Sequence, residues 1–199
     1  MVQCISILGS TGSIGSQSLD IARHLNIKVA ALAAGTRVDD MAAQCREFLP
    51  ELAVMGTEEA AAQLRAQIPD LAVRIAWGEA GLIEAASLDG VDCVITAVVG
   101  MLGLKPTLAA IRAGKRIGLA NKETLVCAGE LVMAEAKAWG AEIIPVDSEH
   151  SAIFQCLMGA GEKREIKRLI LTCSGGPFFG KKKEELKNMT KAHQTLEDG

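Results

Sequence analysis

The chain has 199 residues, of which 49% are hydrophobic and 23% charged, and its formal net charge is −3. This composition is typical of a soluble globular protein of one or two domains, and no run of about 18 apolar residues predicts a membrane span. The weak negative charge and the 3% aromatic content argue against a nucleic-acid-binding surface.

The cysteines and the N-terminal residues predict a cytoplasmic protein. The six cysteines are scattered without a C-x-x-C pair, which favours reduced thiols over disulfides or a zinc site. An apolar run, Cys4 to Leu8, begins almost at Met1. This leaves no room for a signal or transit peptide before the first strand, so we expect a cytoplasmic location.

A glycine-rich stretch organises the first half of the chain. The run Cys4 to Leu8 predicts a buried strand, Ile14 to Leu25 predicts a helix, and Gly9-Ser10-Thr11-Gly12-Ser13-Ile14-Gly15 joins them. The G-x-x-G-x-x-G spacing is a variant of the dinucleotide fingerprint, in which backbone N–H groups at a helix N-terminus touch a pyrophosphate that a Cβ would hold off. An ordinary glycine-rich turn is the alternative.

The second predicted strand, Ile27 to Ala33, favours NADP over NAD. An NAD site places a carboxylate near the end of this strand to hold the ribose 2′-hydroxyl, but none occurs between Ile21 and Val38. The strand is followed by Gly35, Thr36 and Arg37, and Arg37 and the Thr36 hydroxyl could bind a 2′-phosphate with no anion there to repel it. A solvated Arg37 is the alternative reading.

Strands and helices alternate through the next hundred residues, which predicts an α/β fold of the Rossmann type with a doubly wound parallel sheet. The predicted helices are Val38–Phe48, Glu58–Gln67, Leu82–Leu88, Pro106–Ala113 and a helix that ends near Trp139. The predicted strands are Leu52–Met55, Ala72–Ala76, Val91–Val98, a strand that runs into Asn121, and Ala141–Val146.

Two stretches at predicted strand ends carry polar side chains. Asn121 could orient a nicotinamide, and Lys122 could bind an anionic substrate. The equally open alternative is that Asn121 caps the following helix and Lys122 is a solvated surface residue. Asp147 and Glu149 could share one Mg²⁺ or Mn²⁺ ion, because hard cations prefer oxygen ligands. Alternatively, Asp147 caps a helix over Ser151–Met158 and Glu149 is an acid in its first turn.

The last predicted strand, Ile166 to Leu171, leads to Ser174-Gly175-Gly176-Pro177. The Ser174 hydroxyl and the unhindered N–H groups of the glycines could hold a phosphate. A turn closed by Pro177 is the alternative. Lys181 to Lys187 predicts the start of a solvated helix.

Taken together, four stretches resemble the 1-deoxy-D-xylulose-5-phosphate reductoisomerase family: GSTGSIG, LANKETLVCAG, PVDSEHSAIFQCL and LTCSGGPF. Each motif alone is weak, but they occur in the family's order across nearly the whole chain. The resemblance implies an enzyme of non-mevalonate isoprenoid biosynthesis. Such an enzyme uses NADPH and Mg²⁺ or Mn²⁺ to isomerise and reduce 1-deoxy-D-xylulose 5-phosphate to 2-C-methyl-D-erythritol 4-phosphate.

The resemblance also implies roles for residues at matching positions. Those implied to bind the cofactor are Thr11, Gly12, Ser13, Ile14, Gly35, Thr36, Arg37, Asn121 and Glu123. Those implied to contact the phosphorylated substrate are Lys122, Ser148, Glu149 and Ser174, of which Lys122 and Glu149 would be catalytic. Asp147 and Glu149 are implied to be the metal ligands.

Family members look roughly twice as long, so the chain reads as a fragment. We expect an NADP-binding domain over residues 1–146 and the first part of a catalytic domain over residues 147–199. The fragment should bind NADPH without turnover, and the full-length protein should be a homodimer. The alternatives are a non-catalytic NADP-binding module and another NADP-dependent dehydrogenase, of the aspartate-semialdehyde or homoserine type.

Overall fold

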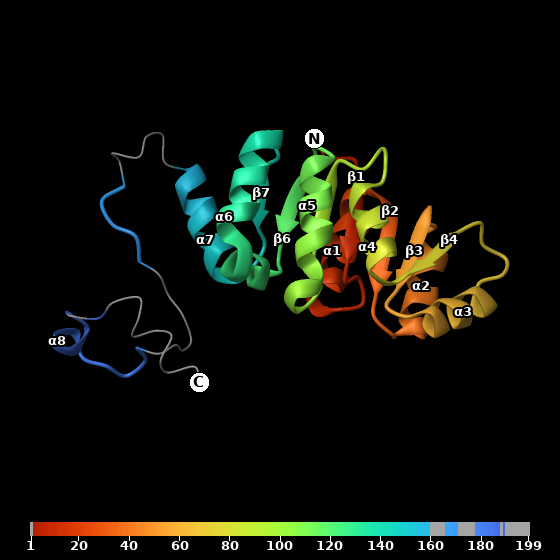
Figure 1. Ribbon diagram of the computed structural model, residues 1–199, viewed down its shortest axis with the longest axis horizontal. Helices are drawn as coiled ribbons and strands as arrows, with labels where there is room; N and C mark the ends of the chain where they lie inside the picture. The colour runs from red at the N-terminus through yellow and green to blue at the C-terminus, as the bar shows by residue number, and fades with distance from the viewer. Residues whose placement is uncertain (1, 160–165, 171–177, 188, 190–199) are drawn as a thin grey trace. The chain divides into compact units, whose positions relative to one another are not determined.

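The computed structural model describes residues 2–159, 166–170, 178–187 and 189 (Figure 1). The chain divides into two compact units, Met1–Asp147 and Ser148–Gly199. This division falls beside the boundary that the sequence predicts. The functions expected of the two domains stay predictions.

The first unit is built on a sheet of seven parallel strands in the order β4-β3-β2-β1-β5-β6-β7. The strands are β1 (Cys4–Leu8), β2 (Lys28–Ala34), β3 (Leu52–Met55), β4 (Arg74–Trp77), β5 (Cys93–Thr96), β6 (Arg116–Leu119) and β7 (Ile143–Pro145). The order runs outward in both directions from β1 and β5, so the doubly wound parallel sheet predicted from sequence is confirmed. In such sheets ligands bind where the direction of winding changes.

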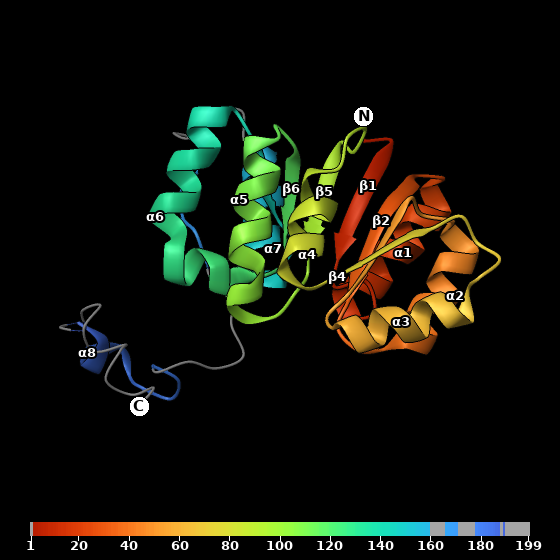
Figure 2. The ribbon, with the colours of Figure 1, turned by 45° about the vertical axis from the view of Figure 1, so that its right-hand side comes forward.

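Helices cover both faces of this sheet, as Figures 1 and 2 show from two sides. Side chains of α1 (Ser13–Leu25), α2 (Val38–Phe48) and α3 (Glu58–Gln67) enter one core cluster, and those of α4 (Gly78–Ser87), α5 (Leu104–Arg112) and α6 (Lys122–Trp139) enter the other. A short 3₁₀ helix, η1 (Gly100–Gly103), precedes α5, and α6 is kinked at Ala128.

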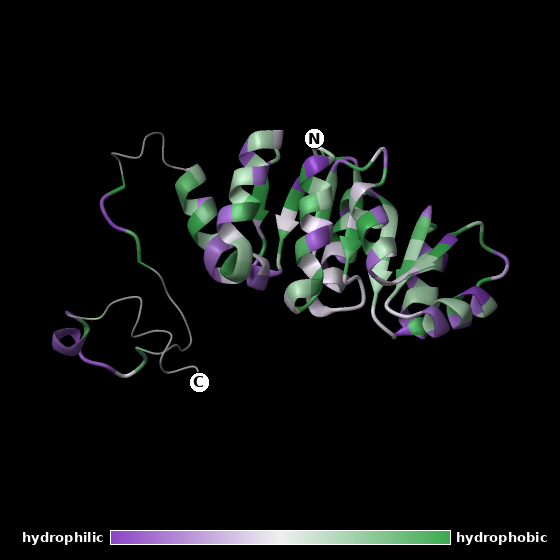
Figure 3. Cartoon of the chain, in the orientation of Figure 1, coloured by the Kyte–Doolittle hydropathy of each residue, from purple (hydrophilic) through white to green (hydrophobic). Residues whose placement is uncertain are grey.

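The central strands are buried on both faces because each lies between two helical layers. All five residues of β1 are buried, and β2 is buried from Val29 onward. Figure 3 shows the same division, with hydrophobic strands in the sheet and hydrophilic residues on the outer helices. This burial provides a frame for the loops at the carboxyl ends of the strands.

Most predicted elements occur, but several bounds differ. Helix α4 begins at Gly78 rather than Leu82, and β5 is shorter than Val91–Val98. Helix α7 (Ser148–Met158) begins three residues before the predicted Ser151, because the polar residues before Ser151 already form its first turn. The strand predicted over Ile166–Leu171 is wrong for residues 166–170, which form no strand, since no described strand pairs with them and a strand needs one. Leu171 lies outside the described residues.

The second unit contains two described helices, α7 and α8 (Lys183–Leu186), and neither has a buried residue. No helix in the described ranges is both long enough and apolar enough to cross a membrane.

Candidate cofactor-binding site

The glycine loop holds the N-terminus of α1 directly against the end of β1. Gly9 has a φ of +95°, and its N–H and that of Ser10 both donate to the Ala33 carbonyl at 2.8 Å. A Cβ on Gly15 would lie 2.1 Å from the Gly9 carbonyl oxygen. Helix α1 can therefore approach the loop this closely only because position 15 is glycine.

Gly12 is less crowded than Gly9 and Gly15. It is the N-cap residue of α1, and a Cβ there would meet only the Gly9 carbonyl oxygen, at 3.3 Å. The first N–H groups of any helix have no partner within that helix, and α1 has no acidic residue in its first turn. The partial positive charge of the helix end is thus available to an anion at Gly12.

A groove of about 310 Å³ lies beside this loop. Its lining comes from the carboxyl ends of β1, β2, β3 and β5 and from α4 and η1, and it comprises Gly9, Thr11, Gly12, Ala34, Gly35, Met55, Gly56, Leu82, Ala97, Val98, Val99 and Leu102. Gly56 lets β3 approach β2, because a Cβ there would lie 3.1 Å from the Gly35 oxygen. A largely apolar groove that ends at a helix N-terminus without acidic residues suits an elongated nucleotide with an anionic group.

Arg37 lies beside the glycine loop, but its surroundings correct one expectation. Its Nη1 donates to the Thr11 carbonyl at 2.6 Å, and its Nε pairs with the Asp40 carboxylate at 2.5 Å. The expectation that no anion stands near Arg37 is therefore wrong. The i,i+3 spacing of Arg37 and Asp40 at a helix start was the signal that could have revealed this pair.

Gln44 contacts the glycine loop, and the sequence did not predict this contact. The Ser10 hydroxyl donates to the Gln44 side chain at 2.7 Å, and the Gln44 amide donates to the Ser10 carbonyl at 3.1 Å. Helix α2 is thus joined to the glycine loop by Gln44 as well as by Arg37. No periodicity or motif in the sequence marks a polar residue on the buried side of α2 as a partner of this loop.

Asn121 is a buried brace at the other end of the groove. Its side-chain amide donates to the carbonyls of Val98 at 2.7 Å and Gly100 at 3.0 Å. Its Oδ1 accepts a hydrogen bond from the Thr124 hydroxyl. Asn121 is the N-cap residue of α6, but its side chain makes no capping hydrogen bond to that helix. Asn121 instead fixes the loop between β5 and η1, whose residues line the groove.

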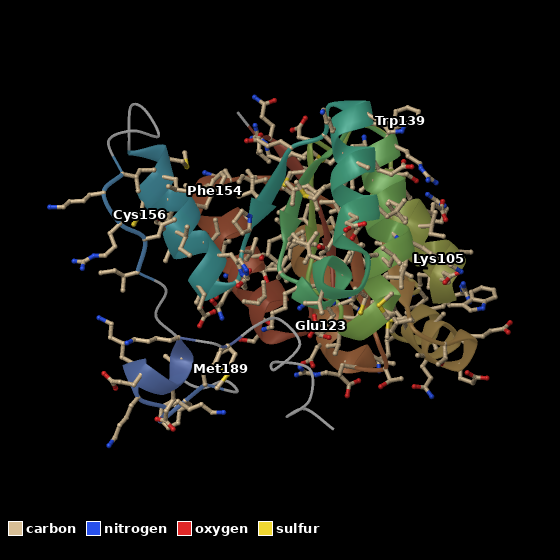
Figure 4. The ribbon with its side chains drawn as sticks, turned by 60° about the vertical axis from the view of Figure 1, so that its left-hand side comes forward. Lys105, Glu123, Trp139, Phe154, Cys156 and Met189 are labelled. Carbon is tan, nitrogen blue, oxygen red and sulfur yellow. The ribbon has the colours of Figure 1, made fainter. Side chains whose placement is uncertain are left out.

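Lys122 and Glu123 follow in the first turn of α6, and both are exposed. Figure 4 shows Glu123 at the end of α6 opposite Trp139. Its carboxylate accepts a hydrogen bond from the Asn121 amide at 3.1 Å. No ion pair joins Lys122 to another residue in the described part of the chain, which leaves its ammonium open to an anionic ligand.

The other predicted site residues lie at or beyond the end of the first unit. Asp147 is its last residue, and Ser148 and Glu149 are exposed residues in the first turn of α7. These positions suit both the metal-ligand and the helix-start alternatives. Among the described residues, no group of three or more His, Cys, Asp or Glu side chains could hold a metal ion. Ser174 lies outside the described residues.

Comparisons with known proteins identify the family. A family model described as 1-deoxy-D-xylulose 5-phosphate reductoisomerase matches residues 5–129, and a second, described as the C-terminal domain of that enzyme, matches residues 143–197. The 1-deoxy-D-xylulose 5-phosphate reductoisomerase of Lachnospira eligens is 58% identical over 187 residues, which are 93% of this chain and 49% of that protein.

Two solved structures are also similar. The enzyme from Zymomonas mobilis in complex with NADPH has a TM-score of 0.81 and 39% identity, over 96% of this chain and 50% of that one. A DOX-P reductoisomerase in complex with magnesium has a TM-score of 0.80 and 44% identity, over 97% of this chain and 51% of that one. This chain spans about half the length of the relatives it matches. The chain belongs to the 1-deoxy-D-xylulose 5-phosphate reductoisomerase family.

Proposed function

We propose that the first unit binds NADPH along the groove beside the glycine loop. The single observation that carries this proposal is that Gly12, at the N-terminus of α1, lines the groove while no acidic residue occupies the first turn of this helix. In this arrangement the N–H groups of Ser13 and Ile14 bind the pyrophosphate, with Thr11 and Gly12 beside it. The solved Zymomonas mobilis relative, a complex with NADPH, supports the same ligand.

At the adenosine end, Gly35, Thr36 and Arg37 would surround the 2′-phosphate. One hydrogen bond to a charged group contributes about 1.5–3 kcal/mol, which is on the order of a tenfold to hundredfold preference for NADPH over NADH. At the other end, Asn121 holds the loop of Val98 and Gly100 in place, and Glu123 borders the nicotinamide. NADPH, when bound, supplies a hydride.

For the whole protein we propose the family reaction, the isomerisation and NADPH-dependent reduction of 1-deoxy-D-xylulose 5-phosphate to 2-C-methyl-D-erythritol 4-phosphate. The names of the relatives support it. Lys122 would attract the anionic substrate, Ser148 and Glu149 would contact it, and Ser174 would bind its phosphate. A homodimer and a cytoplasmic location are further predictions for the whole protein.

A divalent cation is the second proposed ligand. Asp147 and Glu149 supply carboxylate oxygens, which Mg²⁺ and Mn²⁺ prefer, and one relative is a complex with magnesium. Such a cation would polarise substrate oxygens. We expect weak Mn²⁺ binding by this chain because two carboxylates leave most of the coordination shell to water. Titration of the wild type and of Asp147→Asn tests this, and tight binding that survives the substitution would place the ion elsewhere.

The test of NADPH binding is calorimetry on Gly12→Ala. The added methyl group would lie 3.3 Å from the Gly9 carbonyl oxygen, a close contact that requires a shift of a few tenths of an ångström, and it would hold the pyrophosphate away. Thermal unfolding of the variant shows that any loss of binding is not a loss of folded protein. We expect NADPH affinity to fall by about tenfold or more, as the loss of one or more hydrogen bonds to a charged group implies.

The matched control is Gly129→Ala in α6, whose Cβ would meet only the Leu125 Cβ at 4.0 Å and which is not part of the groove lining. Its NADPH affinity should equal that of the wild type. Unchanged binding by Gly12→Ala would contradict the proposed site.

The second candidate is a non-catalytic NADP-binding module. It shares the groove and predicts the same binding results, but it predicts that no residue after Asp147 serves a substrate. Binding of fosmidomycin, the compound named in a further structure of the family, would separate the two. The family model that matches residues 143–197 favours the enzyme, and the family itself argues against an aspartate-semialdehyde or homoserine dehydrogenase.

A further inference from the structure

The guanidinium of Arg37 is held on two sides by groups of this chain. Nη1 donates to the Thr11 carbonyl at 2.6 Å, and Nε pairs with Asp40 at 2.5 Å. A guanidinium binds a phosphate most strongly through two parallel N–H bonds from one of its edges. One such edge joins Nε and Nη2, so a 2′-phosphate that takes it displaces Asp40 from Nε. The other edge joins Nη1 and Nη2, and because Nη1 carries two hydrogens, a phosphate there displaces the Thr11 carbonyl only where that carbonyl accepts the hydrogen on this edge.

The two partners differ in what their displacement costs. The Thr11 carbonyl belongs to the glycine loop, where Thr11 is buried at 9% exposed, so releasing it would leave a carbonyl of a buried residue without this donor. The Asp40 side chain is 45% exposed and the Arg37 side chain 64%, so the Asp40 carboxylate can turn to water. The partner that yields to a phosphate is therefore Asp40.

We propose that Asp40 is a specificity-determining residue that competes with the cofactor 2′-phosphate for Arg37 and so lowers the preference for NADPH. This inference rests on the proposed binding of NADPH and adds a role for Asp40 to it. The competition is mild, because an exposed ion pair contributes little and salt screens it. Asp40 would thus moderate the preference without reversing it.

The neighbouring acid, Asp39, provides a matched control. Both residues lie in the first turn of α2, so each interacts with the same helix dipole. Their side chains have different partners, because Asp39 accepts a hydrogen bond from Gln67 of α3 at 2.7 Å. Neutralising either acid removes one negative charge from this turn, but only Asp40 contacts Arg37.

The experiment compares Asp40→Asn with Asp39→Asn by calorimetry against NADPH and NADH. The asparagine of the first variant keeps an oxygen that can accept from Arg37, so the substitution removes the charge while preserving the shape. We expect NADPH to bind Asp40→Asn about twofold to fivefold more tightly than the wild type, which is within the range for releasing one exposed pair. NADH affinity should stay within about twofold, and Asp39→Asn should match the wild type.

The Arg37→Met variant tests whether Asp40 affects NADPH affinity through Arg37. In Arg37→Met, NADPH should bind weakly, and adding Asp40→Asn should change its affinity by less than about twofold, because no guanidinium remains to compete for. A gain that persists in this background would overturn the proposal, since Asp40 would then repel the phosphate directly. An equal gain with Asp39→Asn would overturn it too, as a general charge effect.

The outcomes also distinguish a failure of the proposed role of Asp40 from a failure of the proposed binding of NADPH. A wild type that prefers NADPH, together with an Asp40→Asn variant of unchanged NADPH affinity, overturns the role of Asp40 alone. A wild type that binds neither nucleotide overturns both proposals. Thermal unfolding of each variant shows whether a change in affinity reflects loss of folded protein.

Discussion

The two units of this chain differ in how much of their apolar surface they bury. In Met1–Asp147, seven strands and six helices enclose two clusters of buried side chains. In the described part of Ser148–Gly199, α7 and α8 contain no buried residue, and the apolar side chains of Leu169, Ile170 and Phe179 are exposed. Burial of apolar surface is the main force that stabilises a folded domain, so the first unit has a source of stability that the described second unit lacks.

This difference matters for the proposed function because the groove proposed to bind NADPH lies wholly within the first unit. The residues expected to serve the substrate and the metal are divided between the two units. Lys122 and Asp147 belong to the first unit, and Ser148 and Glu149 to the second. NADPH binding should therefore depend on the packed core of the first unit, and chemistry should depend on both units.

The largest expected effect concerns turnover. We expect the 199-residue chain to bind NADPH but to show no measurable reaction with 1-deoxy-D-xylulose 5-phosphate and Mn²⁺, because its relatives are about twice as long and catalytic groups that act as a unit fail together. Loss of NADPH absorbance is the measurement, and the full-length Lachnospira eligens relative is the control. Turnover of roughly 1 s⁻¹ or more, within the usual enzyme range, would refute this prediction.

A pair of leucine variants tests the contrast in burial directly. Leu32 in β2 is fully buried, whereas Leu157 in α7 is 39% exposed. Leu32→Ala should lower the free energy of unfolding by about 2–5 kcal/mol because it leaves a cavity in the core. Leu157→Ala should change it by no more than about 0.5 kcal/mol. Urea unfolding measures both, and equal losses would mean that α7 is part of the stabilising core.

The Asn121 brace should have a smaller effect, on both stability and binding. Asn121→Asp replaces the donating amide by an acceptor that faces the carbonyls of Val98 and Gly100. Leaving buried polar groups unpaired costs about 1–3 kcal/mol, and a looser loop should weaken NADPH binding. Gln155→Glu, an amide-to-acid change at an exposed position of α7, is the control. Wild-type stability and NADPH affinity in Asn121→Asp would show that the brace is dispensable.

The smallest expected effect is a dependence of stability on pH. The Asp92 carboxylate accepts hydrogen bonds from the N–H groups of Gln3 at 2.8 Å and Cys4 at 2.9 Å, and these bonds hold its pKa below the ordinary value. The folded state therefore binds fewer protons at this carboxylate than the unfolded state does. The stability it contributes is present above the unfolded pKa, near pH 4, and is lost as the pH falls through the folded pKa.

Urea midpoints measured from about pH 5 down to about pH 3 should thus fall more steeply for the wild type than for Asp92→Asn, which keeps an acceptor oxygen but does not titrate in this range. Parallel curves for the two proteins would assign the acid sensitivity to other carboxylates.

Elements with strong local signals could be predicted from sequence. Helix α3, for example, occupies the predicted Glu58–Gln67, because the Thr57 side chain caps it by accepting from the Ala60 N–H at 3.2 Å. The early start of α4 was not predictable, since Gly78 and Gly81 are poor helix formers. At Gly81 a Cβ would lie 2.7 Å from Val54 Cγ1, so packing against the sheet favours glycine within this helix.

The candidate site likewise contains features that could be predicted from the sequence and features that could not. The glycine spacing marks Gly9, Gly12 and Gly15 in the sequence, because a close approach of backbone to backbone or to a ligand leaves a requirement for glycine at each position. The sequence gives little or no indication of the hydrogen-bond partners of Arg37 and Asn121. Their hydrogen bonds reach carbonyls of Thr11, Val98 and Gly100, and every residue type provides a carbonyl.

By itself, the sequence determined the order of strands and helices in the first unit, the parallel sheet and the position of the glycine loop, since these follow from local periodicity and glycine spacing. Only the tertiary structure decided that Asp40 pairs with Arg37 and that Asn121 braces the groove. It also decided that residues 166–170 form no strand. The hydrogen bonds of Asn121 and the missing strand over residues 166–170 have the same physical reason. A buried amide and a strand both need partners distant in the sequence, and the local sequence pattern does not specify those partners.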